Sequence, residues 1–168
     1  MEEKMNIAVF AGSFDPLTIG HYDIVTRATS FFDEVIVLVN SNVSKHSLFS
    51  VDARVRMAQA AFSSMDCIRV ESFDGLTVSF LDRVGARFLI RGIRHAQDLE
   101  YERALSWNNQ KLNSKIETIF LLSAPEHMAV SSSVVRELLS YNQNVDTYVP
   151  ENMREILLSE WRKLNVRS

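Results

Sequence analysis

Short apolar runs alternate with longer amphipathic segments along most of the chain. The apolar runs cover residues 7–10, 35–39, 68–70, 88–90 and 119–122. The second run is unbroken and mostly β-branched, which is typical of a strand that is covered on both faces. We interpret all of these runs as strands.

The segments between the runs have the apolar spacing of helices. They cover residues 22–32, 51–62, 76–84, 98–112, 134–139 and 151–164. Ser50 is a good N-cap for the second segment, and Gly85 is a natural C-terminal stop for the third. Alternating strands and helices predict an α/β fold: a single domain over residues 1–168, with a doubly wound parallel five-stranded sheet and right-handed crossovers.

The composition narrows the class of protein. The 168 residues, 46% of them hydrophobic, can form one substantial core. A net charge of −3 and a pI near 5.8 argue against a nucleic-acid partner. No apolar stretch reaches the roughly 18 residues needed to cross a membrane, and the N-terminal sequence has no secretory pattern. The sequence therefore predicts a cytoplasmic protein with no membrane partner. The lone Cys67 excludes an internal disulfide.

The segment of residues 11–21 (AGSFDPLTIGH) carries the strongest signal for chemistry. It stands between the first predicted strand and the first predicted helix, where parallel sheets bind ligands. Gly12 allows a close approach of the backbone, and Ser13 offers a hydroxyl group. Gly20 and His21 begin a helix whose free N–H groups and dipole favour an anion. We interpret this segment as a phosphate-binding turn.

Residues that suit a phosphate also follow other predicted strands. Ser44 and Lys45 follow the second strand, Arg91 and Arg94 end the fourth, and three serines at 131–133 follow the fifth. The carboxyl ends of parallel strands meet at one edge of a sheet. Cations, hydroxyl groups and helix N-termini are therefore expected to converge there on an anionic ligand.

Each of these residues also has a purely structural interpretation. His21 could be satisfied by the backbone at a helix start, and the serines could simply cap a helix. Arg91 could form a structural ion pair with Asp98 or Glu102. Lys45 could belong to an ordinary solvated loop.

Several common catalytic motifs are missing. The chain has no GxxxxGK[ST] P-loop, no GxGxxG after the first strand and no GxSxG elbow. No two histidines have the spacing of zinc ligands on a helix. The aromatic residues Phe31 and Trp107 are expected in the core.

Five blocks of the sequence match one known pattern. Residues 12–16 (GSFDP) match G-[ST]-F-D-P, residues 18–21 (TIGH) match T-x-G-H, and Ser44–Lys45 matches a loop lysine. Residues 89–102 match a long Arg-Gly-Ile-Arg to Tyr-Glu block, and residues 130–137 match I-S-S-S/T-x-x-R. The first and last blocks are shared by a nucleotidyltransferase superfamily. With the long block included, the chain resembles the bacterial phosphopantetheine adenylyltransferase family.

This resemblance implies a reaction in which ATP and 4'-phosphopantetheine give dephospho-coenzyme A and pyrophosphate, with Mg²⁺ as cofactor. It also implies a dinucleotide-binding-like nucleotidyltransferase fold, a homohexamer, and feedback inhibition by coenzyme A. The chain departs from the family pattern at Ala11, His127 and Ala129, the last two standing where aromatic residues are usual.

The resemblance also implies roles for individual residues. The implied catalytic residues are His21, Lys45, Ser13 and Arg91. The implied ATP-binding residues are Ser13, Phe14, His21, Gly92, Arg94, Glu102, Ser131, Ser132 and Ser133. The implied phosphopantetheine-binding residues are Ser13, Lys45, Leu76, Arg91 and Asn109. In this scheme His21 donates to an α-phosphate oxygen, and Lys45 bridges the two reacting phosphates.

Three alternatives stay open. A related nucleotidyltransferase could use another acceptor or CTP, although such members typically have histidine where this chain has Thr18. A non-catalytic nucleotide-binding protein could keep the fold, but it has no need of His21 and Lys45. A structural interaction module would require all the phosphate-compatible loops to be coincidental.

Overall fold

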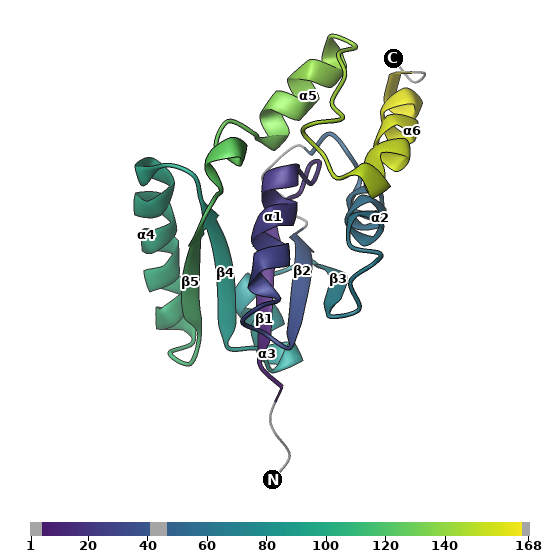
Figure 1. The fold of residues 1–168 in the computed structure, drawn as a ribbon. Coiled ribbons are helices and arrows are strands. Elements are labelled where there is room, and N and C mark those ends of the chain that lie inside the picture. The colour runs from purple at the N-terminus through teal and green to yellow at the C-terminus, as the bar shows by residue number, and fades with distance from the viewer. Residues whose placement is uncertain (1–4, 41–46, 166–168) are drawn as a thin grey trace.

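The computed structural model describes residues 5–40 and 47–165. Within these ranges five parallel strands form one sheet in the order β3-β2-β1-β4-β5 (Figure 1). The strands are β1 (Ile7–Gly12), β2 (Glu34–Asn40), β3 (Ile68–Phe73), β4 (Phe88–Ile93) and β5 (Glu117–Leu122). Each predicted apolar run lies within one of these strands, so the predicted sheet is confirmed.

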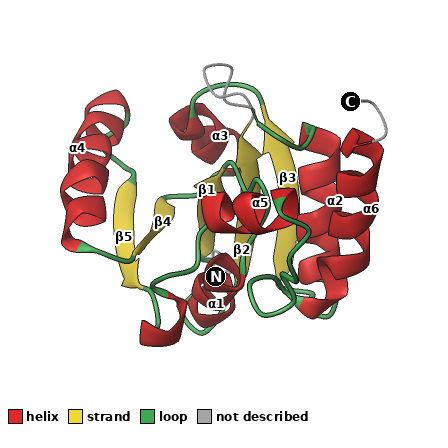
Figure 2. Ribbon diagram, turned by 90° about the horizontal axis from the view of Figure 1, so that it is seen from above, coloured by secondary structure: helices red, strands yellow, loops and turns green. Residues whose placement is uncertain are grey.

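The helices of the described residues cover both faces of the sheet. They are α1 (Ile19–Ala28), α2 (Val51–Ala61), α3 (Thr77–Val84), α4 (Ala96–Leu112), α5 (Ser132–Ser140) and α6 (Arg154–Asn165). Short 3₁₀ turns cover Pro125–His127 and Glu151–Met153. Figure 2 shows α3 on the side of the sheet opposite α1, as a doubly wound fold requires. None of the helices in the described ranges is long and apolar enough to span a bilayer.

Alternate side chains of the central strands face two different hydrophobic cores. Ala8 and Phe10 of β1 belong to the larger core, to which α1, α2 and α6 contribute. Val9 and Ala11 belong to a smaller core beneath α3. The neighbouring β2 alternates in the same way. Both faces of these strands are covered, which explains why their sequences are apolar without interruption.

Three helices begin two or three residues before the positions that the apolar spacing predicted. Thr18 is the N-cap of α1, His95 that of α4 and Ser131 that of α5. A polar capping residue accepts hydrogen bonds from the first turn, so the helix begins before its apolar stripe does. The apolar spacing marks the stripe and therefore misses this first turn.

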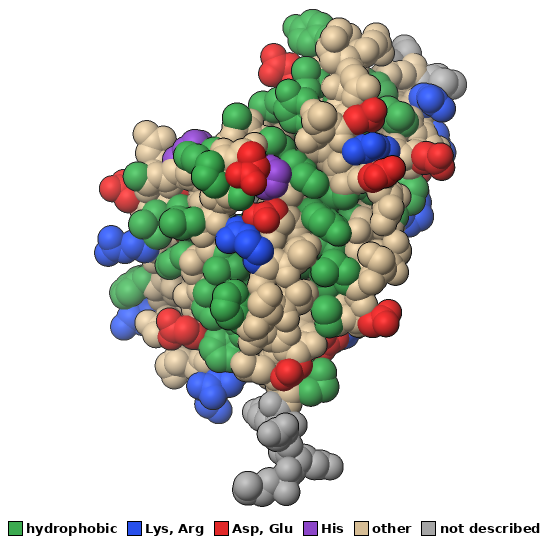
Figure 3. Space-filling model, in the orientation of Figure 1, with side chains coloured by type: hydrophobic (Ala, Val, Ile, Leu, Met, Phe, Trp, Pro, Cys, Tyr) green, Lys and Arg blue, Asp and Glu red, His purple; other side chains and the backbone are tan. Residues whose placement is uncertain are grey.

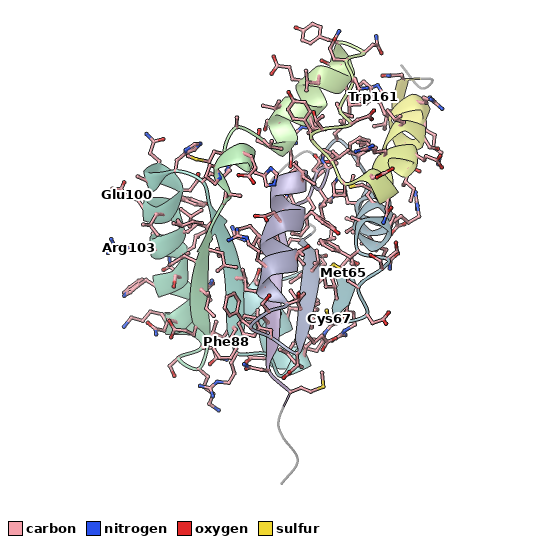
Figure 4. The ribbon with its side chains drawn as sticks, viewed as in Figure 1. Met65, Cys67, Phe88, Glu100, Arg103 and Trp161 are labelled. Atoms are coloured by element: carbon pink, nitrogen blue, oxygen red, sulfur yellow. The ribbon has the colours of Figure 1, made fainter. Side chains whose placement is uncertain are left out.

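Helix α4 is largely open to solvent, and this corrects the expectation for Trp107. The Trp107 side chain is 60% exposed, and Phe31, which precedes β2, is 66% exposed. Both predictions of burial were wrong. Glu102 is the buried residue of α4 within the described structure, and Figure 4 shows Glu100 and Arg103 projecting from this helix away from the sheet. The outer face of α4 is therefore available for contacts.

Candidate active site

Two adjoining cavities lie at the carboxyl ends of the strands. The connections diverge on the two sides of the β1–β4 pair, which is where open α/β sheets form a ligand crevice. The first cavity has a volume of about 310 Å³, and the second has a volume of about 710 Å³. Arg91 and Glu102 line both cavities, so the two meet at this pair.

The structure brings most of the predicted site residues to these cavities. The first cavity is lined, among others, by Phe14, His21, Arg91, Gly92, Arg94, Glu102, Ser131, Ser132 and Ser133. The second is lined, among others, by Ser13, Leu76, Arg91, Glu102 and Asn109. Apart from Ser13, the residues predicted to bind ATP gather around one cavity, and the predicted acceptor residues gather around its neighbour. Ser44 and Lys45 lie outside the described residues.

His21 is the third residue of α1, and its half-buried side chain lines the first cavity. Its Nδ1 atom accepts a hydrogen bond from the backbone N–H of Thr18, with a donor–acceptor distance of 3.0 Å. The ring stands edge-on to the ring of Phe14, with centroids 5.2 Å apart. Because the structural contacts of the ring engage Nδ1, Nε2 is the nitrogen suited to meet a ligand.

His21 is a neutral imidazole at physiological pH. Burial, together with the charges of Arg94 and Arg91, lowers the pKa of His21 to about 4. A neutral imidazole donates from one nitrogen and accepts at the other. It can therefore stabilise charge on a phosphate oxygen through an N–H group without itself gaining or losing a proton.

The ring of Phe14 forms the floor beneath His21. Phe14 is only 2% exposed and has a positive φ of 46°. A Cβ atom on Gly12 would lie 2.9 Å from the Phe14 ring, so no larger residue fits at position 12 without displacing it. Gly12 also lines both cavities, so the close approach of a ligand to its backbone stays a prediction.

Arg91 and Glu102 form a part-buried ion pair that joins β4 to α4. The Nε and Nη2 groups of Arg91 donate to the two carboxylate oxygens of Glu102, at 2.8 and 2.6 Å. Nη1 donates to the backbone oxygen of Ala11. The structural interpretation of Arg91 as an ion-pair residue is thus correct for Glu102. A contact between Arg91 and a phosphate stays a prediction.

Arg94 is held at the rim of the first cavity by the start of α4. Its Nε donates to Asp98 at 3.3 Å, and its backbone N–H donates to the same carboxylate oxygen at 3.1 Å. The Arg94 side chain remains 38% exposed. Its guanidinium group can therefore reach an anion while the backbone beneath it is fixed.

Each of the three serines has a different structural partner. Ser131 accepts from the backbone N–H of Val134 and so caps α5. Ser132 donates its hydroxyl hydrogen to the backbone oxygen of Pro16 at 2.8 Å, and Ser133 accepts from Arg136. The cap interpretation thus holds for one serine. The second ties α5 to the turn after β1, which places the N–H groups of the α5 first turn beside the cavity.

A buried arginine that the sequence did not lead us to expect lies beneath the turn after β1. Arg54 of α2 is 2% exposed, and its Nη1 donates to the backbone oxygens of Ser13 and Asn40, at 2.5 and 3.1 Å. Its Nε donates to the backbone oxygen of Phe49. Arg54 therefore fixes the end of β1 relative to the end of β2. A charged residue on the apolar stripe of a helix is the signal that could have revealed it.

Asp15 completes this buried polar network. Its two carboxylate oxygens accept from the backbone N–H groups of Leu48 and Phe49, at 2.8 and 2.9 Å. Arg136 of α5 donates to the backbone oxygen of Asp15 at 2.6 Å. Asp15 thus joins the turn after β1 to the chain leading into α2 through its carboxylate, and to the middle of α5 through its backbone oxygen, with its carboxylate 3.8 Å from Arg136.

The fold and the cavities define the class of the protein. A family profile described as cytidylyltransferase-like matches residues 9–138. A protein from Vibrio parahaemolyticus described as a nicotinate-nucleotide adenylyltransferase has the same fold: the TM-score is 0.70 over 94% of each chain, at 19% sequence identity. This chain is therefore a cytidylyltransferase-like nucleotidyltransferase by fold and sequence pattern.

Curated relatives place it more closely. It is 42% identical, over 91% of its length and 88% of the relative, to the phosphopantetheine adenylyltransferase of Limosilactobacillus reuteri. It is 44% identical to the phosphopantetheine adenylyltransferase of Bacteroides fragilis, over 89% of this chain and 99% of the relative. That of Thermosynechococcus vestitus is also 44% identical, over 90% of both chains. The chain belongs to the phosphopantetheine adenylyltransferase family.

Proposed function

We propose that this protein transfers AMP from ATP to 4'-phosphopantetheine, forming dephospho-coenzyme A and pyrophosphate in the synthesis of coenzyme A. The observation that carries the proposal is the pair of adjoining cavities that meet at Arg91 and Glu102. One is lined by the residues expected to bind ATP, and the other by residues expected to bind the acceptor. The names of the curated relatives support the choice of acceptor and of the adenylyl group.

The reaction requires two phosphates to be brought together in line. An oxygen of the acceptor phosphate forms a bond to the α-phosphorus of ATP, and the bond from that phosphorus to the bridging oxygen of the β-phosphate breaks. Pyrophosphate leaves with the electron pair of that bond. No covalent intermediate on the protein is needed, so positioning and charge stabilisation supply the catalysis.

His21 stabilises the charge that develops around the α-phosphorus. Its neutral ring lines the first cavity and is fixed through Nδ1, so Nε2–H donates to an α-phosphate oxygen. A donor held in place before the reaction does not have to reorganise as charge develops. The depressed pKa of His21 is compatible with this role, because a ring that is neutral near pH 7 donates a hydrogen bond without transferring a proton.

The leaving pyrophosphate and the acceptor have separate binding groups. Arg94 and the first-turn N–H groups of α5, beside Ser132 and Ser133, face the same cavity as His21 and would hold the pyrophosphate. In the second cavity, Leu76 and Asn109 combine an apolar surface with an amide. That combination suits an acceptor arm that alternates apolar carbons with amide groups. Ser13 and Lys45 are proposed to hold the acceptor phosphate.

We propose that Mg²⁺ is bound mainly by the phosphates of ATP. Among the described residues, no three His, Cys, Asp or Glu side chains are grouped as a metal site. The acidic residues of the first cavity, Asp98 and Glu102, are each engaged by an arginine. Asp98 and Glu102 therefore do not form a metal-binding site of protein side chains. Triphosphate oxygens are ligands that Mg²⁺ prefers, and we assign no step to it.

We further propose that the chain acts as one domain over residues 1–168 and assembles as a homohexamer. The surface of α4 and β5 supports association, because away from the cavities it exposes the large apolar side chains of Leu99, Trp107 and Leu122. Figure 3 shows apolar side chains gathered over these two elements. Exposed apolar patches mark interaction surfaces. Sedimentation of the purified protein tests the assembly.

Inhibition by coenzyme A and a cytoplasmic location also remain proposals. Coenzyme A contains both the pantetheine arm and an adenine nucleotide, so it suits the two adjoining cavities together. Addition of coenzyme A should therefore raise the KM for both substrates in steady-state assays. Constant rates at saturating coenzyme A would contradict this part of the proposal.

Pyrophosphate release tests the reaction itself. The protein is incubated with Mg²⁺ and ATP, with and without 4'-phosphopantetheine, and the product is identified by mass spectrometry. Replacing ATP with CTP tests the alternative of a related nucleotidyltransferase. Release that requires both ATP and this acceptor supports the proposal. Release only with CTP, or no release from a folded protein that binds ATP, contradicts it.

A further inference from the structure

Thr18 makes three hydrogen-bond contacts with His21. It is 1% exposed, and its backbone N–H donates to Nδ1 of His21 at 3.0 Å. Its Oγ1 lies 2.9 Å from the same Nδ1 atom, and Oγ1 also accepts from the backbone N–H of His21 at 3.4 Å. Together these contacts form the capping box of α1, in which the residue facing Thr18 is a histidine.

The chemistry of these contacts fixes where the hydrogen of the imidazole lies. A backbone N–H is always a donor, so Nδ1 must present its lone pair to Thr18. Oγ1 accepts from His21 N–H, and its own hydrogen is free to donate to the same lone pair. The ring hydrogen must then be on Nε2.

The same contacts oppose protonation of the ring. An imidazolium would carry a hydrogen on Nδ1 and point it at the N–H of Thr18, which would bring two donors face to face. The charged groups near the ring are Arg91 and Arg94, which also disfavour a cation there. Phe14 packs edge-on against the ring from the core side.

We propose that Thr18 is a positioning residue for the reaction: its hydroxyl and backbone N–H hold His21 in the Nε2–H tautomer, with that hydrogen directed at the phosphate site. The catalytic part of this inference rests on the proposed function, in which His21 donates to an α-phosphate oxygen. The tautomer itself can be observed in the free protein without any substrate.

The test is a Thr18→Val variant compared with Thr18→Ser. Valine keeps the shape and the backbone N–H but removes the hydroxyl, whereas serine retains it. In ¹⁵N-detected NMR of the imidazole nitrogens near pH 7, the wild type and Thr18→Ser should show His21 as the Nε2–H tautomer alone. In Thr18→Val the backbone N–H is the one remaining donor to Nδ1, so the Nε2–H tautomer should remain the major form, but a measurable population of the Nδ1–H tautomer should appear. We expect its kcat to fall about five- to tenfold, the loss that one hydrogen bond represents, with a KM for ATP within about twofold of the wild type.

Ser50→Ala is the matched control for loss of a helix cap. Ser50 caps α2 by accepting from the backbone N–H of Ala53 at 3.2 Å, and it makes no contact with His21 among the described residues. This variant should lose stability as capping variants do but keep the His21 spectrum and kcat. The proposal is overturned if Thr18→Val keeps the pure Nε2–H tautomer, whether or not its kcat falls. It is equally overturned if the tautomers mix while kcat stays at the wild-type value.

The failure of this inference can be told apart from failure of the proposed function. If 4'-phosphopantetheine is not a substrate but the tautomer shifts in Thr18→Val, the positioning role stands and only the acceptor is wrong. The kinetic comparison is then made with the acceptor that supports turnover.

Discussion

Arg91 of β4 meets both carboxylate oxygens of Glu102 on α4, and this pair stands where the two cavities join. The charge of the arginine is therefore balanced before any phosphate arrives, and its planar group is held in one orientation. In the proposed reaction, a phosphate between the cavities would meet a guanidinium whose direction is already set by the carboxylate of Glu102.

The two-point geometry of this pair should matter more than its charge. Arg91→Lys keeps the charge but lacks the planar pair of nitrogens that meets both oxygens side by side, so we expect kcat/KM for 4'-phosphopantetheine to fall at least about tenfold. The free energy of unfolding should fall by about 1–2 kcal/mol. Initial rates and urea denaturation measure these effects. Arg103→Lys, on the exposed side of α4, is the control, and equal kinetics in the two variants would contradict the prediction.

Loss of the His21 side chain should lower turnover with little effect on the fold. Removal of one preorganised donor to a developing oxyanion typically costs about 2.7–4 kcal/mol of activation free energy. His21→Ala should therefore lose roughly a hundredfold or more in kcat while its circular dichroism spectrum is kept. Near-normal pyrophosphate release from this variant would remove His21 from the mechanism.

The depressed pKa of His21 should make the protein less stable in mild acid. The pKa is about 4 in the folded chain and 6.5 in the reference state, so the unfolded chain binds the proton more readily between these values. Stability is then complete above about pH 6.5 and falls as the pH is lowered toward 4, by at most about 3 kcal/mol from this residue. Urea denaturation of the wild type and of His21→Gln across this range measures it. Parallel curves for the two proteins would show that His21 titrates normally.

The buried Arg54 should contribute far more to stability than its neighbour Arg56. Arg54→Met leaves the backbone oxygens of Ser13, Asn40 and Phe49 without their donor, and we expect a loss of about 3 kcal/mol in the free energy of unfolding. Arg56 forms an exposed pair with Glu160, and Arg56→Met should cost less than about 1 kcal/mol. Thermal denaturation of both variants provides the comparison. Equal losses would mean that the network around Arg54 is not structurally important.

The sheet was predictable because its central strands need apolar residues on both faces, and a short, mostly β-branched run such as residues 35–39 favours a strand over a helix. The candidate site was predictable in outline because its residues follow strands whose carboxyl ends share one edge. The apolar spacing alone misses the starts of α1 and α5, because it does not report the capping hydrogen bonds of Thr18 and Ser131. The residue types at 20–21 and 131–133 did indicate that helices begin there. The predicted burial of Trp107 was wrong for a different reason. Its aromatic character predicted burial, but its position on the outer face of α4 leaves it exposed.

Arg54 shows the limit of reading residues by type. Its position on α2 places it among the buried residues Ala53, Met57 and Ala58, where a charge is unexpected. Only the fold reveals that backbone oxygens from three separate segments surround it. Which backbone oxygens surround Arg54 depends on how β1, β2 and α2 pack together in the fold, and this packing cannot be predicted from the local sequence.

The packing of His21 on Phe14 has a consequence for engineering this chain. Phe10 lies in the larger core and contacts Phe14, with ring centroids 5.4 Å apart, and Phe14 in turn supports His21. Interior substitutions here would tilt the imidazole that stands above them. Thermostability and turnover therefore cannot be optimised separately at these two phenylalanines. Substitutions that are meant to raise the thermostability of this chain are therefore better placed elsewhere, on α6 or in the smaller core beneath α3.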